Sequence, residues 1–279
     1  MALLAKARSR RNPNQKYLQP IHPNAGVTAA YRRKLDRLVT EMNRSVEYWV
    51  KAAYRANEPV IAQDDLPASA LKAAIRKLTQ RWQKSFDEAA QELAEYFAKA
   101  ASERSDSALK NILKKGGFTV QFRPTKAQRD ILQATINENV RLIKSIPAQY
   151  MTQVEGSVMR SVQTGRDLET LTKDLQDHYG VTKRRAAFIA RDQNNKATAA
   201  LTRARQIEIG VTEAVWVHSG GGKEPRPTHL RAGRDKQKYD VREGWYDPDA
   251  DGKGKGRKIY PGELPNCRCV ARSVIPGFS

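Results

Sequence analysis

The sequence predicts an α+β fold that is mostly α-helical, with an elongated helical N-terminal part followed by a small α+β C-terminal domain. Two observations predict this. Before residue 210, long stretches repeat apolar residues every three or four positions, which is the spacing of amphipathic helices. After Gly210, β-branched residues, glycine-rich loops and prolines replace that pattern, and this composition is typical of short strands joined by turns.

The pattern divides the chain into four parts. Residues 1–23 are basic and proline-containing and predict an extended arm. Residues 24–116 predict a helical hairpin that serves as an adapter, residues 117–164 a helical connecting region, and residues 165–279 the C-terminal domain.

Each helix of the hairpin has one apolar stripe. The first stripe begins at Leu35 and reaches Ala53, and Pro59 ends that helix because proline disfavours helix at the preceding residue. The second helix is expected from Pro67 to about Arg104. We expect both stripes to pack in a core rather than to bind a cofactor.

The connecting region is interrupted by glycines and prolines. Phe118, Val120 and Phe122 alternate with polar residues, which indicates a brief strand or extended segment. We then expect a helix to about Ile146 and a new helix from Pro147. Further on, Gly180 predicts a helix end in the left-handed conformation, with Thr182 capping the next helix.

The C-terminal domain begins with a predicted strand over 211–217, which includes Trp216. Flexible loops follow at 220–222 and 252–258, where glycine alternates with lysine in the second. A final short strand is expected over 267–271.

The chain is strongly basic. Lys and Arg number 50 against 30 Asp and Glu, a formal charge of +20, so nucleic acid or an acidic protein surface is the expected partner. Few aromatic residues argue against a protein that stacks single-stranded bases. The candidate DNA contacts lie in the basic arm and in the second glycine-rich loop: Arg8, Arg10, Arg11, Lys16, Lys253, Lys255, Arg257 and Lys258. A solvated loop is the alternative for the last four.

The two cysteines are one residue apart, which disfavours a disulfide between them and suits a reducing compartment. No apolar run approaches the roughly 20 residues that span a bilayer, so no membrane partner is expected. Basic residues follow the short apolar N-terminus, the reverse of the order in a secretory signal. We therefore expect the chain to act where it is made or to be carried into an assembly.

The C-terminal half carries an ordered series of short motifs. It begins with G-x-D-L at 165–168 and the alanine-rich I-A-R-D-Q-N-N-K-A-T-A-A at 189–200. It continues with the strand that contains Trp216, then R-P-T-H at 226–229, Gly233, and N-C-R-C at 266–269. In this order and spacing, residues 150–272 resemble the phage head-morphogenesis family typified by the Mu F-type minor head protein. The residues of the series for which we expect structural roles are Trp216, Arg226, His229, Gly233, Asn266, Cys267, Arg268 and Cys269.

The resemblance implies a structural minor head protein of a tailed phage, inside the head near the portal, and in the host cytoplasm during assembly. It implies the portal protein and packaged double-stranded DNA as partners, with the major capsid or scaffolding protein as further candidates, and a role in head assembly, DNA packaging or ejection. Two features depart from the family. Asp192-Gln193 replaces a frequent Thr-Glu, and 261–265 replaces a frequent histidine before C-R-C.

The same segment suggests three alternative chemistries. His218, His229, Cys267 and Cys269 offer the ligand types of zinc, but C-x-C is tighter than the usual cysteine spacing of a zinc site, so two buried thiols and no cofactor are favoured. A Cys269–His229 nucleophile pair lacks an orienting carboxylate in the sequence. A zinc-dependent DNA-processing enzyme, a nuclease built on His218, His229 and Asp235, lacks a carboxylate cluster and remains the alternative to a non-enzymatic protein. We expect Arg226 and Arg268 to bridge turns of the motif, with an exposed basic patch as the alternative.

Overall fold

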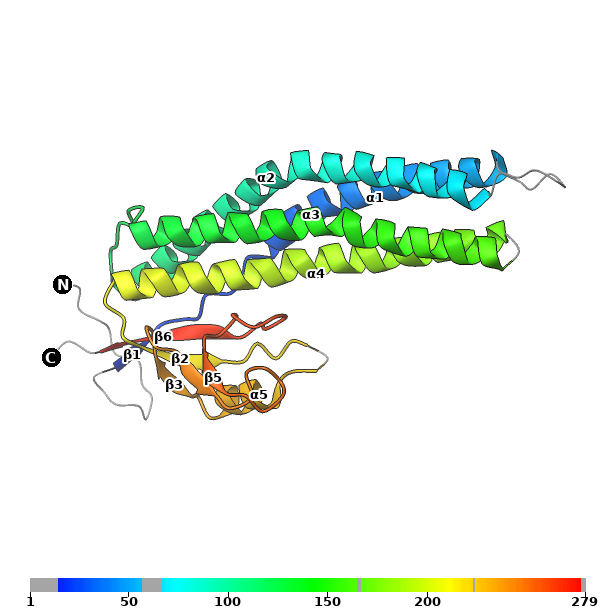
Figure 1. The fold of residues 1–279 in the computed structure, drawn as a ribbon. Coiled ribbons are helices and arrows are strands. Elements are labelled where there is room, and N and C mark those ends of the chain that lie inside the picture. Colours follow the sequence, from blue (N-terminus) through cyan, green and yellow to red (C-terminus); the bar gives the residue numbers. More distant parts are fainter. Residues whose placement is uncertain (1–14, 57–66, 165–166, 223, 277–279) are drawn as a thin grey trace. The chain divides into compact units, whose positions relative to one another are not determined.

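The computed structural model describes residues 15–56, 67–164, 167–222 and 224–276 of the 279. Long helices precede a small sheet region (Figure 1), which confirms the mostly helical fold with a C-terminal α+β part. The long helices are α1 (Ala25–Ala56), α2 (Pro67–Lys115), α3 (Lys126–Gln163) and α4 (Leu168–Glu208). Across the described ranges, no helix combines the length and apolar character needed to cross a membrane.

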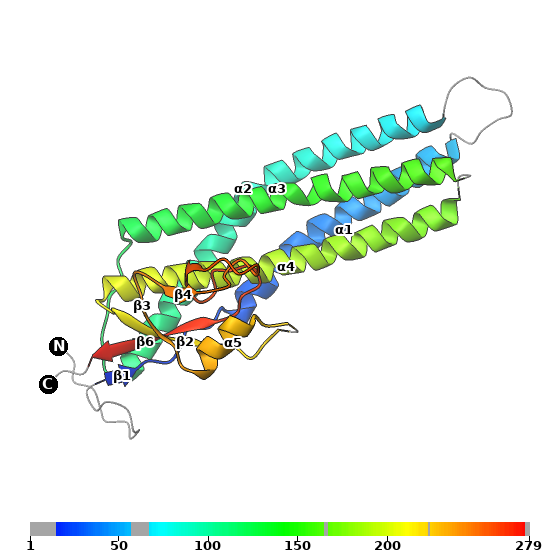
Figure 2. The same ribbon diagram turned by 60° about the horizontal axis from the view of Figure 1, so that its bottom comes forward.

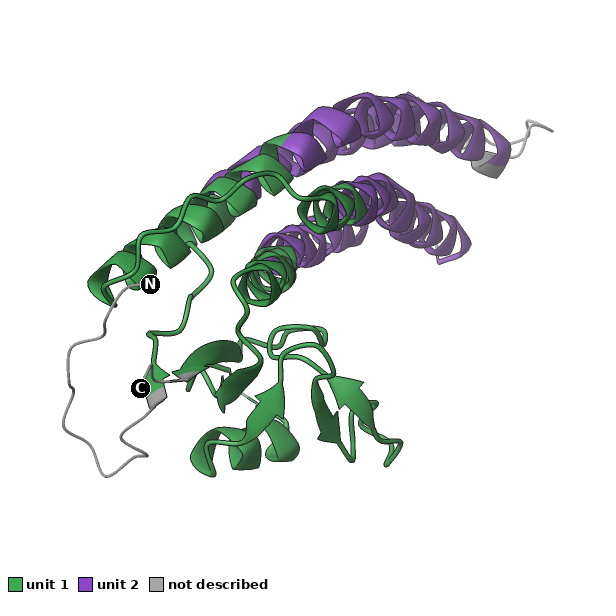
Figure 3. Ribbon diagram, turned by 90° about the vertical axis from the view of Figure 1, so that its left-hand side faces the viewer, with its two compact units in different colours: residues 1–28, 96–135, 191–279 green, residues 29–95, 136–190 purple. Residues whose placement is uncertain are grey.

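The chain forms two compact units that are discontinuous in sequence (Figure 3). We call residues 29–95 and 136–190 the helix unit, and residues 1–28, 96–135 and 191–279 the sheet unit. Each long helix contributes a segment to both units, because the boundaries at 28, 95, 135 and 190 fall inside the helices.

Buried hydrogen-bonded pairs join the helices of the helix unit. Tyr150 donates to Asn43 Oδ1 at 2.7 Å, and Tyr31 donates to Asn139 Oδ1 at 2.9 Å. Burial raises the pKa of both tyrosines far above the usual range, so both stay neutral donors. The apolar side chains of the helical stripes are buried in the same unit, including Leu35, Val39, Val46, Leu71, Ile75, Phe86, Ile143 and Val154.

Two predicted helix breaks are wrong. Pro147 lies inside α3, and Gly180 lies inside α4. Proline removes the helical bond to the carbonyl of Ile143, but the fully buried Ile146 and Tyr150 on either side hold the helix in the core. Thr182 does not cap a new helix, because its hydroxyl donates back to the carbonyl of residue 178 at 2.8 Å within the same helix. Tertiary packing outweighs both local signals.

The sheet unit contains a four-stranded antiparallel sheet in the order β1-β6-β2-β3 (Figure 2). These strands are β1 (Gln15–Tyr17), β2 (Glu213–Val217), β3 (Lys238–Asp240) and β6 (Val270–Pro276). A separate antiparallel pair is formed by β4 (Trp245–Asp247) and β5 (Arg257–Ile259). Between β2 and β3 the chain forms the short helix α5 (Pro227–Arg234), which packs on β2.

The ends of the sheet differ from the sequence-based expectation. The described end of the basic arm is a strand rather than a free extension, since β1 pairs with β6. The last strand starts at Val270, so both cysteines precede it in a turn. Phe118, Val120 and Phe122 form no strand, but their half-buried side chains pack beside Leu18, Ile21, Leu109 and Leu113.

Arg205 connects three segments of the sheet unit. Its guanidinium is 5% exposed and forms two hydrogen bonds with the Asp106 carboxylate, at 2.9 and 2.8 Å. It also donates to the Arg123 carbonyl and to Glu208, both at 2.7 Å. A buried guanidinium needs such a complete set of acceptors, because an unpaired buried charge is strongly unfavourable.

We predict that Arg205→Ala lowers the free energy of unfolding by about 3–5 kcal/mol, because it leaves the Asp106 carboxylate without its buried partner. Arg205→Lys should recover only part of this loss, since lysine cannot reproduce the two-bond geometry. Urea unfolding followed by tryptophan fluorescence measures both. Lys99→Ala, an exposed change on α2, is the control and should stay within about 0.5 kcal/mol. An Arg205→Ala protein as stable as this control would contradict the assignment.

Candidate functional site

The N-C-R-C turn is fastened to the C-terminal half of α4. The buried carboxylate of Asp192 accepts the backbone N–H of Asn266 at 2.5 Å and pairs with Lys196 at 3.0 Å. Asn195 donates to the carbonyl of Cys267 at 3.1 Å. Asn266 itself has a left-handed φ of 59°, a conformation that asparagine tolerates better than most residues. The sharp start of the turn and its helix contacts together set the direction of both cysteines.

The turn before the cysteines lies close against the same helix. Gly262 has a φ of 84°, and a Cβ there would stand 2.9 Å from the Cβ of Ala199, so only glycine fits. On the other side, the guanidinium of Arg226 donates to the Pro265 carbonyl through both terminal nitrogens, at 3.3 and 3.2 Å. Arg226 sits at the N-cap of α5 and therefore bridges α5 to the turn.

The two cysteines and one histidine meet in the core of the sheet unit. His229 Nδ1 lies 3.5 Å from Cys267 Sγ and 3.8 Å from Cys269 Sγ. All three ligand atoms lie within 4.8 Å of one another. Each side chain is buried, with exposed fractions of 2% for His229 and 4% for each cysteine. Among the described residues, this is the one group of three or more His, Cys, Asp or Glu placed to hold a metal ion.

A carboxylate lies behind the histidine. Asp247 is fully buried at the end of β4, and its Oδ2 is 3.2 Å from His229 Nε2. Although the two atoms are close, the carboxylate is out of line with an N–H on that nitrogen, so the contact is electrostatic rather than a well-formed hydrogen bond. Asp247 also accepts the Thr228 hydroxyl at 3.3 Å and the Asp249 N–H at 3.1 Å. The Trp216 indole packs edge-on against the imidazole, with ring centroids 4.9 Å apart.

The two thiols share one proton unequally. A hydrogen bond from Cys269 lowers the pKa of Cys267 to about 4, assisted by His229 and opposed by burial. The hydrogen bond to Cys267 and burial raise the pKa of Cys269. One thiolate at neutral pH suits either a metal ligand or a nucleophile.

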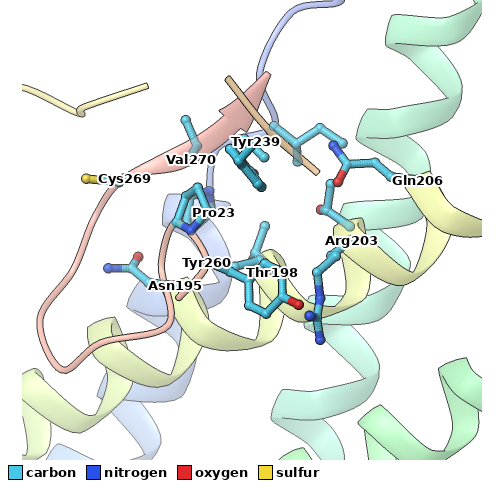
Figure 4. Close-up of a pocket in the computed structure, with 14 residues that line it drawn as sticks. Pro23, Asn195, Thr198, Arg203, Gln206, Tyr239, Tyr260, Cys269 and Val270 are labelled. Atoms are coloured by element: carbon cyan, nitrogen blue, oxygen red, sulfur yellow. The ribbon is translucent and has the colours of Figure 1, made fainter. Parts of the chain in front are cut away.

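A nucleophile would need space for a substrate. The sequence offered a cysteine and a histidine without an orienting carboxylate, and the fold supplies that carboxylate in Asp247. The side chains of Cys267, Cys269, His229 and Asp247 are all buried, however. The cavity that Cys269 lines has a volume of about 20 Å³, which is room for about one water molecule. Figure 4 shows Asn195, Thr198, Arg203 and Gln206 of α4 on one side of it, and Tyr239, Tyr260 and Val270 among the other lining residues. This geometry favours a structural role over acyl or phosphoryl transfer.

Other residues of the motif series occupy separate positions. His218 is half-buried outside the cluster, and its Nδ1 accepts the Gly220 N–H at 3.1 Å. A Cβ on Gly233 would stand 2.5 Å from the Cβ of His218, so α5 approaches β2 too closely for any side chain there. Arg268 is half-buried beside Gly221, and its Nε is buried without a hydrogen bond. Asp235 is exposed and pairs with Arg234 at 3.0 Å, away from the cluster.

The basic residues that the sequence suggested as DNA contacts do not gather in one place. Arg8, Arg10, Arg11 and the motif residue Gly165 lie outside the described residues. Lys16 donates to the Gly116 carbonyl at 2.7 Å. In the second glycine-rich loop, Lys253 and Lys255 are exposed, whereas Arg257 pairs with Glu263 at 2.6 Å and Lys258 with Glu243 at 2.5 Å. Carboxylates thus already engage two of the four loop cations.

Sequence reasoning missed a basic groove of about 450 Å³ in the sheet unit. Its lining holds five basic or imidazole side chains and no carboxylate, and comprises Tyr17, Val215, Trp216, Val217, His218, Leu230, Gly233, Arg234, Lys236, Lys238 and Arg272. The cluster R-D-K-Q-K at 234–238 was visible in the sequence, but Arg272 and Tyr17 join it only through strand pairing. Asp192, Asn195 and Asp247 were missed because their partners lie on segments far away in the sequence.

We predict that Asp192→Ala loosens the cysteine turn without unfolding the chain. The part-buried N–H of Asn266 loses its hydrogen bond to a charged acceptor, at a cost of about 1.5–3 kcal/mol, so alkylation of Cys267 and Cys269 in the native protein should accelerate roughly tenfold or more. Iodoacetamide labelling read by mass spectrometry measures this rate. Asp235→Ala, which removes an exposed carboxylate from α5, should leave the rate unchanged. Equal rates in the two variants would contradict the fastening role of Asp192.

Residues 152–272 match the family model described as Phage Mu protein F like protein. A protein of Haemophilus influenzae described as uncharacterized is 28% identical over 275 residues, covering 97% of this chain and 57% of the relative. The chain therefore spans little more than half the length of that relative. No solved structure matches the chain. The matched region contains the cysteine turn, His229 and Asp247, and over residues 152–272 the chain is similar to the Phage Mu protein F like family.

Proposed function

We propose that this phage head-morphogenesis protein is a non-enzymatic minor head protein that binds the portal and faces packaged double-stranded DNA inside the head. It contributes to head assembly, DNA packaging or ejection by binding. The observation that carries this proposal is the family match over 152–272, which covers the cysteine turn, α5 and the strands from β2 onward. The N-terminal helices, outside the match, serve as the adapter to the other head components.

The arrangement of the site supports a binding role. A nuclease that uses two metal ions needs several carboxylates directed at one point. Within the described part of the chain, the group that offers three metal-ligand side chains consists of His229 and the two cysteines, and it is buried. Asp235, required by the nuclease alternative, instead pairs with Arg234 at the surface.

An exposed aromatic pair on α1 supports docking to another protein. Tyr48 and Trp49 are 65% and 50% exposed, and their rings meet edge to face at 5.1 Å. Tryptophan and tyrosine are enriched among the residues that dominate protein–protein binding energy. We assign this pair to the contact with the portal.

The basic groove supports contact with DNA. A formal charge of +20 favours a polyanion as partner, and cations contact phosphates without reading the base sequence. The groove presents Arg234, Lys236, Lys238 and Arg272. Its lining has no carboxylate, but Asp235 pairs with Arg234 and Glu213 with Lys238 from beside it, each at 3.0 Å. We assign it to the DNA backbone, together with Lys253 and Lys255 of the exposed loop.

Portal binding is tested by capture on the purified portal of the same phage. We predict that the wild-type chain is retained at moderate salt and that Tyr48→Ala/Trp49→Ala loses most of this retention, because interface aromatic residues each contribute about 2 kcal/mol or more. Tyr246→Ala, which removes another exposed aromatic residue, is the control. A wild-type chain that the portal does not retain would contradict the proposal.

DNA contact is tested by fluorescence anisotropy with mixed-sequence duplexes at several salt concentrations. Arg234→Ala/Lys236→Ala should weaken binding to all sequences and reduce the slope of log affinity against log salt by roughly 0.9 for each phosphate that is no longer neutralised. Lys253→Ala/Lys255→Ala tests the exposed loop in the same way. Lys77→Ala/Lys99→Ala removes two exposed charges from α2 and is the matched control. Slopes equal to the control in both test variants would contradict DNA contact through the sheet unit.

A further inference from the structure

The nitrogen–sulfur distances of the buried cluster match the edges of a tetrahedral metal site, and the two sulfurs lie within 4.8 Å of each other. With zinc–sulfur bonds of about 2.3 Å and zinc–nitrogen bonds of about 2.0–2.1 Å, a tetrahedral site separates sulfur from nitrogen by about 3.6 Å. The Nδ1 atom of His229 lies 3.5 and 3.8 Å from the two sulfurs. The side chains therefore need little rearrangement to accept an ion between them.

We propose that His229 Nδ1, Cys267 Sγ and Cys269 Sγ bind one zinc ion. Two thiolates and one imidazole are ligands that zinc prefers over the oxygen donors chosen by magnesium or calcium. The C-x-C spacing permits this because the cysteines lie in a turn that begins at the left-handed Asn266, ahead of β6. From that turn, both sulfurs face the same imidazole nitrogen.

The residues behind the histidine suit a metal ligand. An ion on Nδ1 leaves the imidazole proton on Nε2, and Nε2 faces the buried Asp247 carboxylate at 3.2 Å. A carboxylate close behind a ligating histidine attracts the Nε2 proton electrostatically and so favours the tautomer whose Nδ1 is free to bind the ion, although this contact is not a well-formed hydrogen bond. Asp247 is held in turn by the Thr228 hydroxyl and the Asp249 N–H, so the carboxylate has a defined position.

We assign the ion a structural role, in which it holds two segments of the sheet unit together. No further His, Cys, Asp or Glu of the described residues joins the group, so we assign the fourth position to water, although most structural zinc sites fill it with a protein ligand and open positions belong to catalytic sites. Burial of all three side chains keeps substrates away. The ion joins α5 to the start of β6 across 38–40 residues, which include the exposed glycine-rich loop.

Zinc content of the full chain, purified without chelators and measured by plasma mass spectrometry, tests the proposal. We expect about one zinc per chain in the wild type and a loss of most of it in Cys267→Ser/Cys269→Ser and in His229→Ala. His218→Ala removes a histidine of the same unit that lies outside the cluster, and should keep the full zinc content. Loss of zinc from His218→Ala, or its retention by the double cysteine variant, would overturn the assignment.

If the cysteine variants fail to fold, a second measurement on the wild-type chain still tests the proposal. Wild-type chain stripped by chelator is titrated with Co²⁺ alone, then with Zn²⁺. We expect Co²⁺ to produce the intense near-ultraviolet absorption of cobalt–thiolate bonds, and Zn²⁺ to abolish this absorption at about one equivalent. X-ray absorption spectroscopy of the zinc form should then show about two sulfur ligands per ion. A stripped protein that takes up neither ion would refute the proposal, whatever the result of the portal and DNA experiments.

Discussion

The attachment of the N-C-R-C turn to α4 by hydrogen bonds is the constraint on which the rest of the sheet unit depends. Asp192 and Asn195 form hydrogen bonds with the backbone of Asn266 and Cys267. Arg226, at the start of α5, donates to the carbonyl of Pro265. These contacts join a helix, a turn and a second helix that are far apart in sequence. The direction of both cysteines, the position of His229 and the start of β6 follow from them. Without these contacts, the turn would lose the bonds to α4 that direct Cys267 and Cys269 toward His229.

Periodicity predicted the elements that have one amphipathic face, because their apolar spacing survives in any tertiary context. The helices before residue 210 and the strand at Trp216 belong to this class. Pro147 and Gly180 misled the prediction of helix ends because buried neighbours outweigh a lost backbone bond or a weak propensity. The helix α5 was missed although Pro227 at its first turn is a recognised start signal, since its eight residues are too few for a periodic pattern.

The site was predictable in composition but not in geometry. The sequence singled out His229, Cys267 and Cys269, and the fold brings them together. It also suggested His218, which the fold places elsewhere, and it could not identify Asp247, which lies on a short strand with no pattern of its own. The basic groove shows the same limit, because Arg272 and Lys238 meet only through strands that pair across β2. Contacts between distant segments, rather than local preferences, decide which polar residues share a site.

These features together support the proposal of a protein that acts by binding: long helices with an exposed aromatic pair, a sheet unit with a basic groove, and a buried cluster of two cysteines and a histidine. An electron cryo-microscopy map of the assembled head with this chain resolved tests that account most directly. The account predicts the chain inside the head, with Tyr48 and Trp49 against the portal and the groove toward DNA. A chain missing from the head, or resolved with the aromatic pair in solvent and the groove turned from DNA, would contradict it.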